Sequence, residues 1–238
     1  MTTAGEGTDA GANSDAWPCN EDEALRVQDR LRALVSLESE GLLAGARRVA
    51  GLDVAYAVDE SVVAGAVALV DPRTGDVVES ATATRPVDFP YVPGLLAFRE
   101  IPALLDALDR LAEPPDVLVC DGYGLAHPRR FGLACHLGVL TGLPSLGVAK
   151  TAFVGAFDEP GPRRGNWSAL VDGGDEVGRV LRTQDGVKPV FVSVGHRVGV
   201  QEAAELTLRL AARYRLPETT RQADQLSRHA LAQALSLG

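Results

Sequence analysis

The feature that most constrains the fold is a run of apolar residues, Val117–Cys120, that ends in Asp121. A short run that is wholly apolar suits a strand buried on both faces, and such strands belong to parallel sheets covered by helices. A second run of this type, Ser145–Ala149, follows a helical pattern at Phe131–Leu140. Because strands alternate with a helix here, the order predicts an α/β fold.

Three further strands precede this region and predict a different arrangement. The segments Val49–Tyr56, Val62–Val70 and Val77–Thr84 follow one another closely, and Asp71–Gly75 between the last two is a clear turn. Strands joined in this way pair as an antiparallel meander. We therefore expect a mixed sheet, with a three-strand antiparallel meander plus parallel strands, and helices on both of its faces.

The other segments complete one expected domain at residues 21–238, since no internal repeat and no linker divides them. Apolar residues at helical spacing predict four further helices, at Glu21 to about Leu43, about Pro102–Leu111, about Val200–Tyr214 and about Arg221–Leu235. Two further strands are predicted near Trp167–Val171 and Val190–Val194. Residues 1–20 lack apolar periodicity, so we expect an acidic, disordered tail there.

Composition and charge restrict the class of protein. The 238 residues are 46% hydrophobic and contain no unbroken apolar stretch long enough to span a membrane. Three cysteines form no CxxC pair and no signal peptide is recognisable, so we expect a reduced, cytoplasmic protein. The net charge is −9, yet beyond residues 1–23 the chain carries 26 acids against 23 bases. Charge alone gives no positive support for a nucleic-acid partner.

Two aspartates occupy positions where a carboxylate is unfavourable unless it is paired or binds metal. Asp53 interrupts an apolar strand, and Asp121 stands where a buried strand ends. If those strands are neighbours, the two side chains can face each other across the sheet, and Asp121 lies at a strand end, where α/β proteins place functional groups. Hard oxygen ligands of this kind suit Mg²⁺ or Mn²⁺. Glu100 and Asp224, near expected helix starts, could complete the pocket.

The segment Pro90-Tyr91-Val92-Pro93-Gly94 predicts a rigid, protruding turn. The two prolines fix the backbone and restrict the residues before them, and Gly94 lets the chain leave sharply. A rigid turn with an aromatic tip is suited to insertion between stacked bases.

The loop Gly122–Arg130 lies directly behind the second aspartate and adds possible ligand contacts. Gly122 permits a close approach of the backbone, and His127 and Arg129 are candidates for phosphate or sugar contacts.

Each of these residues can also be explained by a structural role without a functional site. Asp121 before glycine is a common turn residue, and Glu100 alone is most often a solvated or ion-paired acid. Asp224 in the first turn of a helix is explained by the helix macrodipole, and His127 by an ordinary loop hydrogen bond. The case for a site therefore rests on the combination.

Six segments in this order resemble the endonuclease V family of deoxyinosine-specific endonucleases, and the resemblance covers roughly residues 21–230. The segments are Gly51–Tyr56, Pro90–Gly94 with Phe98–Glu100, Asp121–Arg129, Gly147–Lys150, Gly195–Arg197 and Leu216–Arg221. The chain departs from the family pattern at Ala55 and Tyr123, and the change at Tyr123 could alter base preference.

The resemblance implies a ribonuclease H-like fold and a role in DNA repair. It further implies hydrolysis of the second phosphodiester bond on the 3′ side of hypoxanthine, leaving 3′-hydroxyl and 5′-phosphate. The partner would be DNA that contains deoxyinosine. The protein is expected to act as a monomer and to have no membrane partner. The segment Pro90–Gly94 matches the strand-separating wedge of the family, with Tyr91 at its tip.

The resemblance also assigns roles to the acidic residues. Asp53 and Asp121 match the metal-binding aspartates, and Glu100 matches a further acid that is catalytic and contacts the metal. Lys150 matches a catalytic lysine near the scissile bond. Asp224 matches a metal-binding position where family members carry either aspartate or histidine. The implied cofactor is Mg²⁺, for which Mn²⁺ is expected to substitute.

Three alternatives remain open from the sequence. A nuclease of the same fold could act on inosine in RNA, because one 2′-hydroxyl separates the two substrates. A lesion-binding module without catalysis is disfavoured by the intact Asp53, Glu100 and Asp121. A protein that binds a small phosphorylated ligand is disfavoured because no Walker pattern and no GxGxxG after a strand is present.

Overall fold

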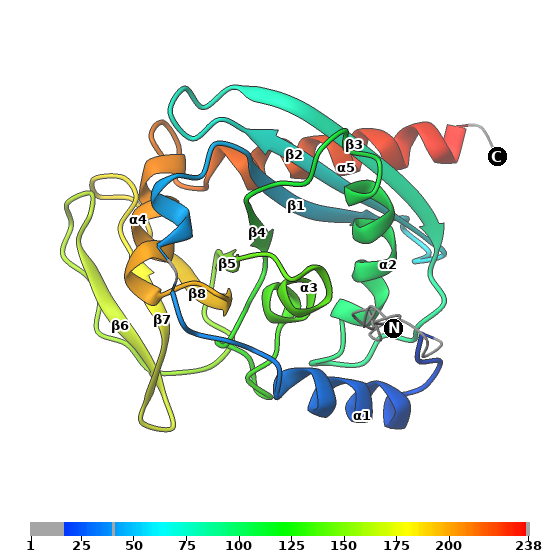
Figure 1. Cartoon of the computed structure of the whole chain (residues 1–238), viewed down its shortest axis with the longest axis horizontal. Helices are drawn as coiled ribbons and strands as arrows, with labels where there is room; N and C mark the ends of the chain where they lie inside the picture. Colours follow the sequence, from blue (N-terminus) through cyan, green and yellow to red (C-terminus); the bar gives the residue numbers. More distant parts are fainter. Residues whose placement is uncertain (1–16, 40, 237–238) are drawn as a thin grey trace, which may run out of the picture.

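The computed structural model describes residues 17–39 and 41–236, and one mixed sheet of eight strands forms the centre of this part of the chain (Figure 1). The spatial order of the strands is β3-β2-β1-β4-β5-β8-β7-β6. In chain order the strands are β1 (Val49–Tyr56), β2 (Val62–Val70), β3 (Val77–Pro86), β4 (Val117–Asp121), β5 (Ser145–Ala149), β6 (Trp167–Asp172), β7 (Asp175–Leu181) and β8 (Val190–His196).

The pairing of the strands confirms the predicted mixed sheet. β1, β2 and β3 form an antiparallel meander, whereas β1, β4 and β5 are parallel neighbours. β8 then lies antiparallel beside β5, and β7 and β6 continue the sheet as an antiparallel hairpin.

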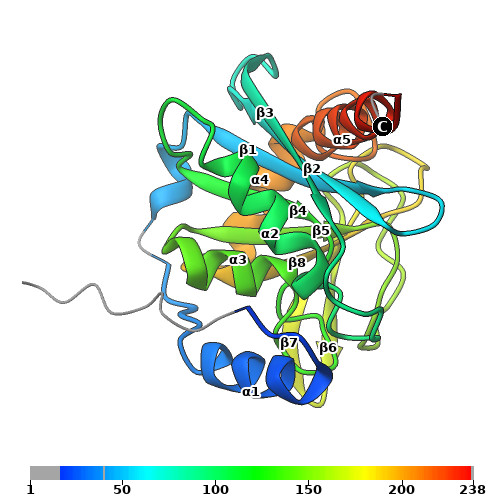
Figure 2. The same cartoon turned by 90° about the vertical axis from the view of Figure 1, so that its right-hand side faces the viewer.

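Helices cover both faces of this sheet (Figure 2). On one face lie α2 (Ala97–Leu108) and α3 (Leu133–Thr141), with α1 (Glu21–Arg32) packed against α3. On the other face lie α4 (Val200–Leu210) and α5 (Glu218–Ser236), and a short 3₁₀ turn spans Leu42–Ala44. Alternate residues of a strand point to opposite faces of the sheet. Leu52 and Leu118 pack with α2 and α3, and Val49 and Val119 pack with α4. This period of two is what a strand buried on both sides requires.

The first helix ends at Arg32, so the predicted extension to Leu43 is wrong. The chain after the helix is held instead by the end of β8. The Ser36 amide donates to His196 Nδ1 at 3.1 Å, and the Arg197 amide donates to the Ser36 carbonyl at 2.7 Å. These tertiary hydrogen bonds replace the ones that a continued helix would form.

The predicted end of α4 at Tyr214 is also wrong, because α4 ends at Leu210. The Arg164 guanidinium donates to the carbonyls of Leu208 at 2.6 Å and Ala211 at 2.8 Å. It thereby satisfies acceptors that the end of a helix leaves free.

The strand β7 was not among the predicted elements. It forms a hairpin with β6 through Gly173 and Gly174, which have φ angles of +59° and +92°. Two glycines in this backbone region are the signature of a tight hairpin, and this signal was present in the sequence.

The helix α2 begins at Ala97, five residues before its expected start at Pro102. Proline inside a helix has no N–H to offer the carbonyl four residues earlier, which here is that of Phe98. The Nε1 of Trp17 donates to this carbonyl at 2.9 Å. The last residues of the tail expected at 1–20 therefore contact the fold, while residues 1–16 lie outside the described part.

The helix α5 begins at Glu218 rather than near Arg221, so Asp224 lies in its second turn and not in its first. The explanation of Asp224 by the helix macrodipole is therefore wrong, because that effect is confined to the first turn. In the described part of the chain, no helix has the length and apolar character needed to cross a membrane.

Candidate active site

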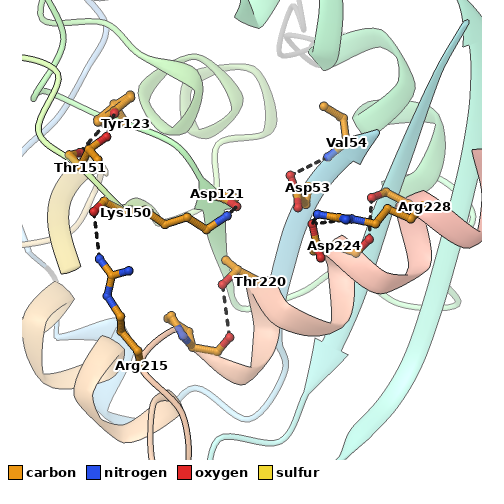
Figure 3. Close-up of polar contacts among 12 residues, drawn as sticks. Asp53, Val54, Asp121, Tyr123, Lys150, Thr151, Arg215, Thr220, Asp224 and Arg228 are labelled. Carbon is orange, nitrogen blue, oxygen red and sulfur yellow. Dashed lines mark hydrogen bonds and ion pairs between the residues drawn. The ribbon is translucent and has the colours of Figure 1, made fainter. Parts of the chain in front are cut away.

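Asp53 and Asp121 come together because β1 and β4 are parallel and in register. Leu52 pairs with Cys120 in this ladder, and each aspartate is the next residue along its strand. Burial, followed by the negative charge of Asp121, raises the pKa of the Asp53 carboxyl to about 7. The structure thus brings the two predicted aspartates close enough for their charges to interact (Figure 3).

Glu100 approaches the same place from α2, on one face of the sheet. Its side chain is buried in the first turn of that helix. Burial, then the charges of Asp53 and Asp121, raises the pKa of the Glu100 carboxyl to about 8. A third predicted acid therefore belongs to the cluster.

Asp224 approaches from the opposite face, on α5, and a glycine makes this possible. A Cβ atom at Gly51 would lie 2.1 Å from the carbonyl oxygen of Thr219, so α5 could not pack so closely on β1 with any other residue. The charge of Asp224 contributes to the raised pKa of Asp53. Its Oδ1 accepts hydrogen bonds from Arg228 Nε at 3.0 Å and Nη2 at 2.8 Å.

Lys150 stands directly after β5 and faces the cluster. Its Nζ lies 3.3 Å from Asp121 Oδ2, and its side chain is half exposed. The backbone of Lys150 is fixed by Arg215, whose Nη2 donates to the Lys150 carbonyl at 2.9 Å (Figure 3). The same guanidinium bonds the carbonyls of Lys188 and Pro189, both at 2.8 Å. Sequence reasoning missed Arg215, because its partners lie far from it along the chain.

The predicted turn at Pro90–Gly94 protrudes and is anchored at both ends. Phe89 and Leu95 are buried, whereas the side chain of Tyr91 is 65% exposed. Gly94 has a φ of +82°, which only glycine adopts without strain. The turn is therefore a firmly held projection with an aromatic tip.

A cavity of about 400 Å³ separates this turn from the carboxylates. Its lining combines predicted residues from three parts of the chain, which are Tyr91, Val92, Pro93, Gly94, Glu100, Asp121, Gly122 and His127. One hollow thus has the turn on one wall and acidic groups on the other.

Three rings form a further wall of this cavity. Phe153, which sequence reasoning missed, lies with its ring centre 5.2 Å from Tyr123 and 5.5 Å from His127. Burial lowers the pKa of His127 to about 4, so the imidazole is neutral at pH 7. Its Nδ1 accepts from the Arg129 amide at 3.2 Å, which places the ring proton on Nε2.

Arg129 is not brought to the cavity. Its Nη2 lies 2.6 Å from Asp29 Oδ1 on α1, and its side chain is absent from the cavity lining. The neighbouring Arg130 pairs with Asp172. The predicted phosphate contact of Arg129 stays a prediction.

The donor set of the cluster fits a hard divalent cation. Asp53, Glu100, Asp121 and Asp224 offer only carboxylate oxygens, and their mutual repulsion is the kind that a cation relieves. Among the described residues, no three His, Cys, Asp or Glu side chains are close enough to enclose a metal by themselves. Carboxylate oxygens are ligands that Mg²⁺ takes in proteins, together with waters and the phosphate of a substrate.

Comparisons with known proteins show the family of the chain. The family model for endonuclease V matches residues 29–225. The chain is 59% identical to endonuclease V of Streptomyces avermitilis over 218 residues, which cover 92% of this chain and 95% of the relative.

Solved structures show the same architecture. The crystal structure of endonuclease V from Streptomyces avermitilis superposes with a TM-score of 0.86 at 57% identity, covering 92% of this chain and 96% of that one. Endonuclease V of Ciona intestinalis, in complex with a 24mer DNA containing an inosine followed by a ribo-adenosine, superposes with a TM-score of 0.78 at 28% identity, covering 90% and 98%.

The sheet order, the flanking helices and these structural matches confirm the expected ribonuclease H-like fold. The match of the family model spans most of the chain and includes every carboxylate of the cluster. The chain therefore belongs to the endonuclease V family of nucleases.

Proposed function

We propose that this nuclease is a metal-dependent DNA repair enzyme that recognises deoxyinosine and hydrolyses the second phosphodiester bond on its 3′ side. The products would be a 3′-hydroxyl and a 5′-phosphate. The observation that carries the proposal is the single cavity with Tyr91 on one wall and Glu100 and Asp121 on the other. A base held in that cavity brings the backbone that follows it over the carboxylates.

Recognition requires the lesion base to leave the stack. Flipping costs a few kcal/mol, and it costs least for a poorly paired base such as hypoxanthine. Tyr91 is exposed at the tip of a rigid turn, so it can fill the gap that the base leaves. Stacking on an aromatic ring stabilises a base by about 1–3 kcal/mol, which is enough to offset that cost.

The carboxylates form the reaction centre in this proposal. Asp53 and Asp121 would hold Mg²⁺, with Glu100 and Asp224 as further ligands, directly or through water. A cation bound there would supply Lewis acidity, to activate a water and to stabilise negative charge on the phosphate. Lys150 projects its ammonium to the same place, where it can stabilise the negative charge that develops on the phosphate oxygens.

Substitution of the two strand aspartates tests the reaction centre. Asp53→Ala and Asp121→Ala should each lower the rate of cleavage of a deoxyinosine duplex by about a hundredfold or more, because each removes a carboxylate that would hold the cation at the reacting phosphate. Binding of the same duplex should persist, since Tyr91 and the cavity remain. Asp76→Ala, in an exposed turn, is the matched control. Normal cleavage by both variants would refute the site.

A second candidate substrate is inosine in RNA. The DNA bound by the Ciona intestinalis relative carries a ribo-adenosine after the inosine, so a 2′-hydroxyl is accommodated next to the lesion in that protein. Two strands that differ only in the sugars around inosine decide between the candidates. Faster cleavage of the deoxyribose strand supports the repair function, and faster cleavage of the ribose strand favours the endoribonuclease.

A further inference from the structure

A second hollow, of about 420 Å³, lies on the other side of the carboxylate cluster, between β1 and α5. It is lined by the end of β1 and by the outer side of α5, including Val54, Tyr56, Asp224, Arg228 and Leu231. The helix residues that line the cavity beside Tyr91 belong to α2 and α3, which lie on the other face of the sheet from α5, so the two hollows lie on opposite sides of the cluster. Apart from Asp224, none of its lining residues belongs to the proposed reaction centre, and we call this hollow the α5 groove.

The α5 groove has the chemistry of a site for one nucleic-acid strand. Among its lining residues Asp224 and Arg228 are charged, and most of the others are apolar. Arg228 is 72% exposed and uses two N–H groups on Asp224 Oδ1. Because a guanidinium has five N–H donors, three remain for a phosphate while the ion pair persists. The apolar side chains can contact sugars and base faces.

The direction of the bound DNA strand follows from the order of the cavity beside Tyr91, the carboxylate cluster and the α5 groove. A lesion base in the cavity beside Tyr91 lies 5′ to the bond that is cut over Asp53 and Asp121. The strand beyond that bond must leave the cluster away from this cavity, which is toward Asp224. We propose that the α5 groove binds the strand on the 3′ side of the scissile bond, with Arg228 on a phosphate. This inference rests on the proposed function, because that function sets the strand direction.

A binding measurement without metal tests the groove. Two deoxyinosine strands are labelled at the 5′ end and paired with the same complementary strand. The short one ends at the nucleotide after the scissile bond, and the long one continues for about ten nucleotides. Dissociation constants are measured by fluorescence anisotropy in EDTA over a series of salt concentrations.

Arg228→Ala should weaken binding of the long strand by about three- to tenfold, as expected for one charged contact to phosphate. The short strand should bind as before. The slope of log K against log salt for the long strand should fall by about 0.7–0.9, the value for one phosphate. Arg228→Lys should keep most of the affinity, and Arg228→Glu should enlarge the loss. Arg209→Ala, an exposed arginine on α4, is the matched control.

Equal losses on the two strands, or no loss on either, would overturn the proposal for the groove. If the proposed function is wrong, the same experiment gives a different result. In that case the wild-type protein would bind an all-canonical strand as tightly as the deoxyinosine strand at both lengths. Arg228 is exposed, so unfolding does not explain a loss, and an unchanged Tm of the variant verifies this.

Discussion

Asp53 makes the folded state less stable whenever its carboxyl is ionised without a cation nearby. Its pKa lies at about 7 in the folded chain and near 3.8 in an ordinary environment, and the pKa of Glu100 is raised from 4.5 to about 8. The folded state therefore binds more protons than the unfolded state between about pH 4 and pH 8. By linkage, the free energy of unfolding of the metal-free protein falls as pH rises through this window.

Asp53→Asn should remove much of this pH dependence. One unit of pKa corresponds to about 1.4 kcal/mol, so the group contributes a few kcal/mol, or roughly 10 °C in Tm for a chain of this size. In EDTA, the wild-type Tm should drop between pH 5.5 and pH 8 by more than that of the variant. Mg²⁺ should raise the wild-type Tm more at pH 8, because the cation binds ionised carboxylates. Equal pH dependence in wild type, Asp53→Asn and the exposed control Asp76→Asn would contradict this account.

Arg215 holds the backbone of Lys150 and is expected to act through it. Arg215→Met removes hydrogen bonds to three carbonyl oxygens, including that of Lys150, so the ammonium is no longer fixed beside Asp121. We expect the rate of cleavage to fall about tenfold, with KM little changed. In a Lys150→Met background the same substitution should have no further effect on rate. Additive losses would show that Arg215 acts independently of Lys150.

These residues show what a sequence discloses at this scale. Asp53 and Asp121 were predictable because each breaks an apolar strand pattern at a point where a carboxylate is unfavourable. Phe153 and Arg215 break no local pattern. Their contacts are with Tyr123, His127 and the Lys150 carbonyl, which only the folded chain brings near them.

At the scale of elements, the turn at Pro90–Gly94 is rigid because its flanks are buried and its prolines restrict the backbone. Tyr91→Ala should therefore remove the wedge without moving the carboxylates. We expect the rate of cleavage of deoxyinosine in duplex DNA to fall at least tenfold, and the rate for the same lesion in a single strand to fall less, because no stacked partner must be separated there. Equal losses on the two substrates would argue against a strand-separating role.

The element boundaries show where local sequence is insufficient. The strands of the meander were predicted from residue type, whereas the end of α1 at Arg32 depends on hydrogen bonds that join Ser36 to His196 and Arg197. The start of α2 depends on Trp17, whose Nε1 donates a hydrogen bond to the Phe98 carbonyl because Pro102 has no N–H to donate to it. Such contacts join segments distant in sequence, and no periodicity records them.

At the scale of the whole molecule, the sheet separates two hollows and holds the acidic cluster between them. α2 supplies Glu100 from one face, and α5 supplies Asp224 from the other. Gly51 allows α5 to approach β1 closely enough for this. The proposed path of the strand, from the cavity beside Tyr91 over the strand ends to the α5 groove, follows from this arrangement.

The most direct test of the account is strand nicking of a labelled duplex with one deoxyinosine, in Mg²⁺ and in EDTA, beside a twin duplex with canonical bases. We expect a single cut in Mg²⁺, at the second phosphodiester bond on the 3′ side of the lesion. We expect no cut in EDTA and none in the twin. A cut that persists in EDTA, or that falls equally on the twin, would contradict a metal-dependent, lesion-directed nuclease.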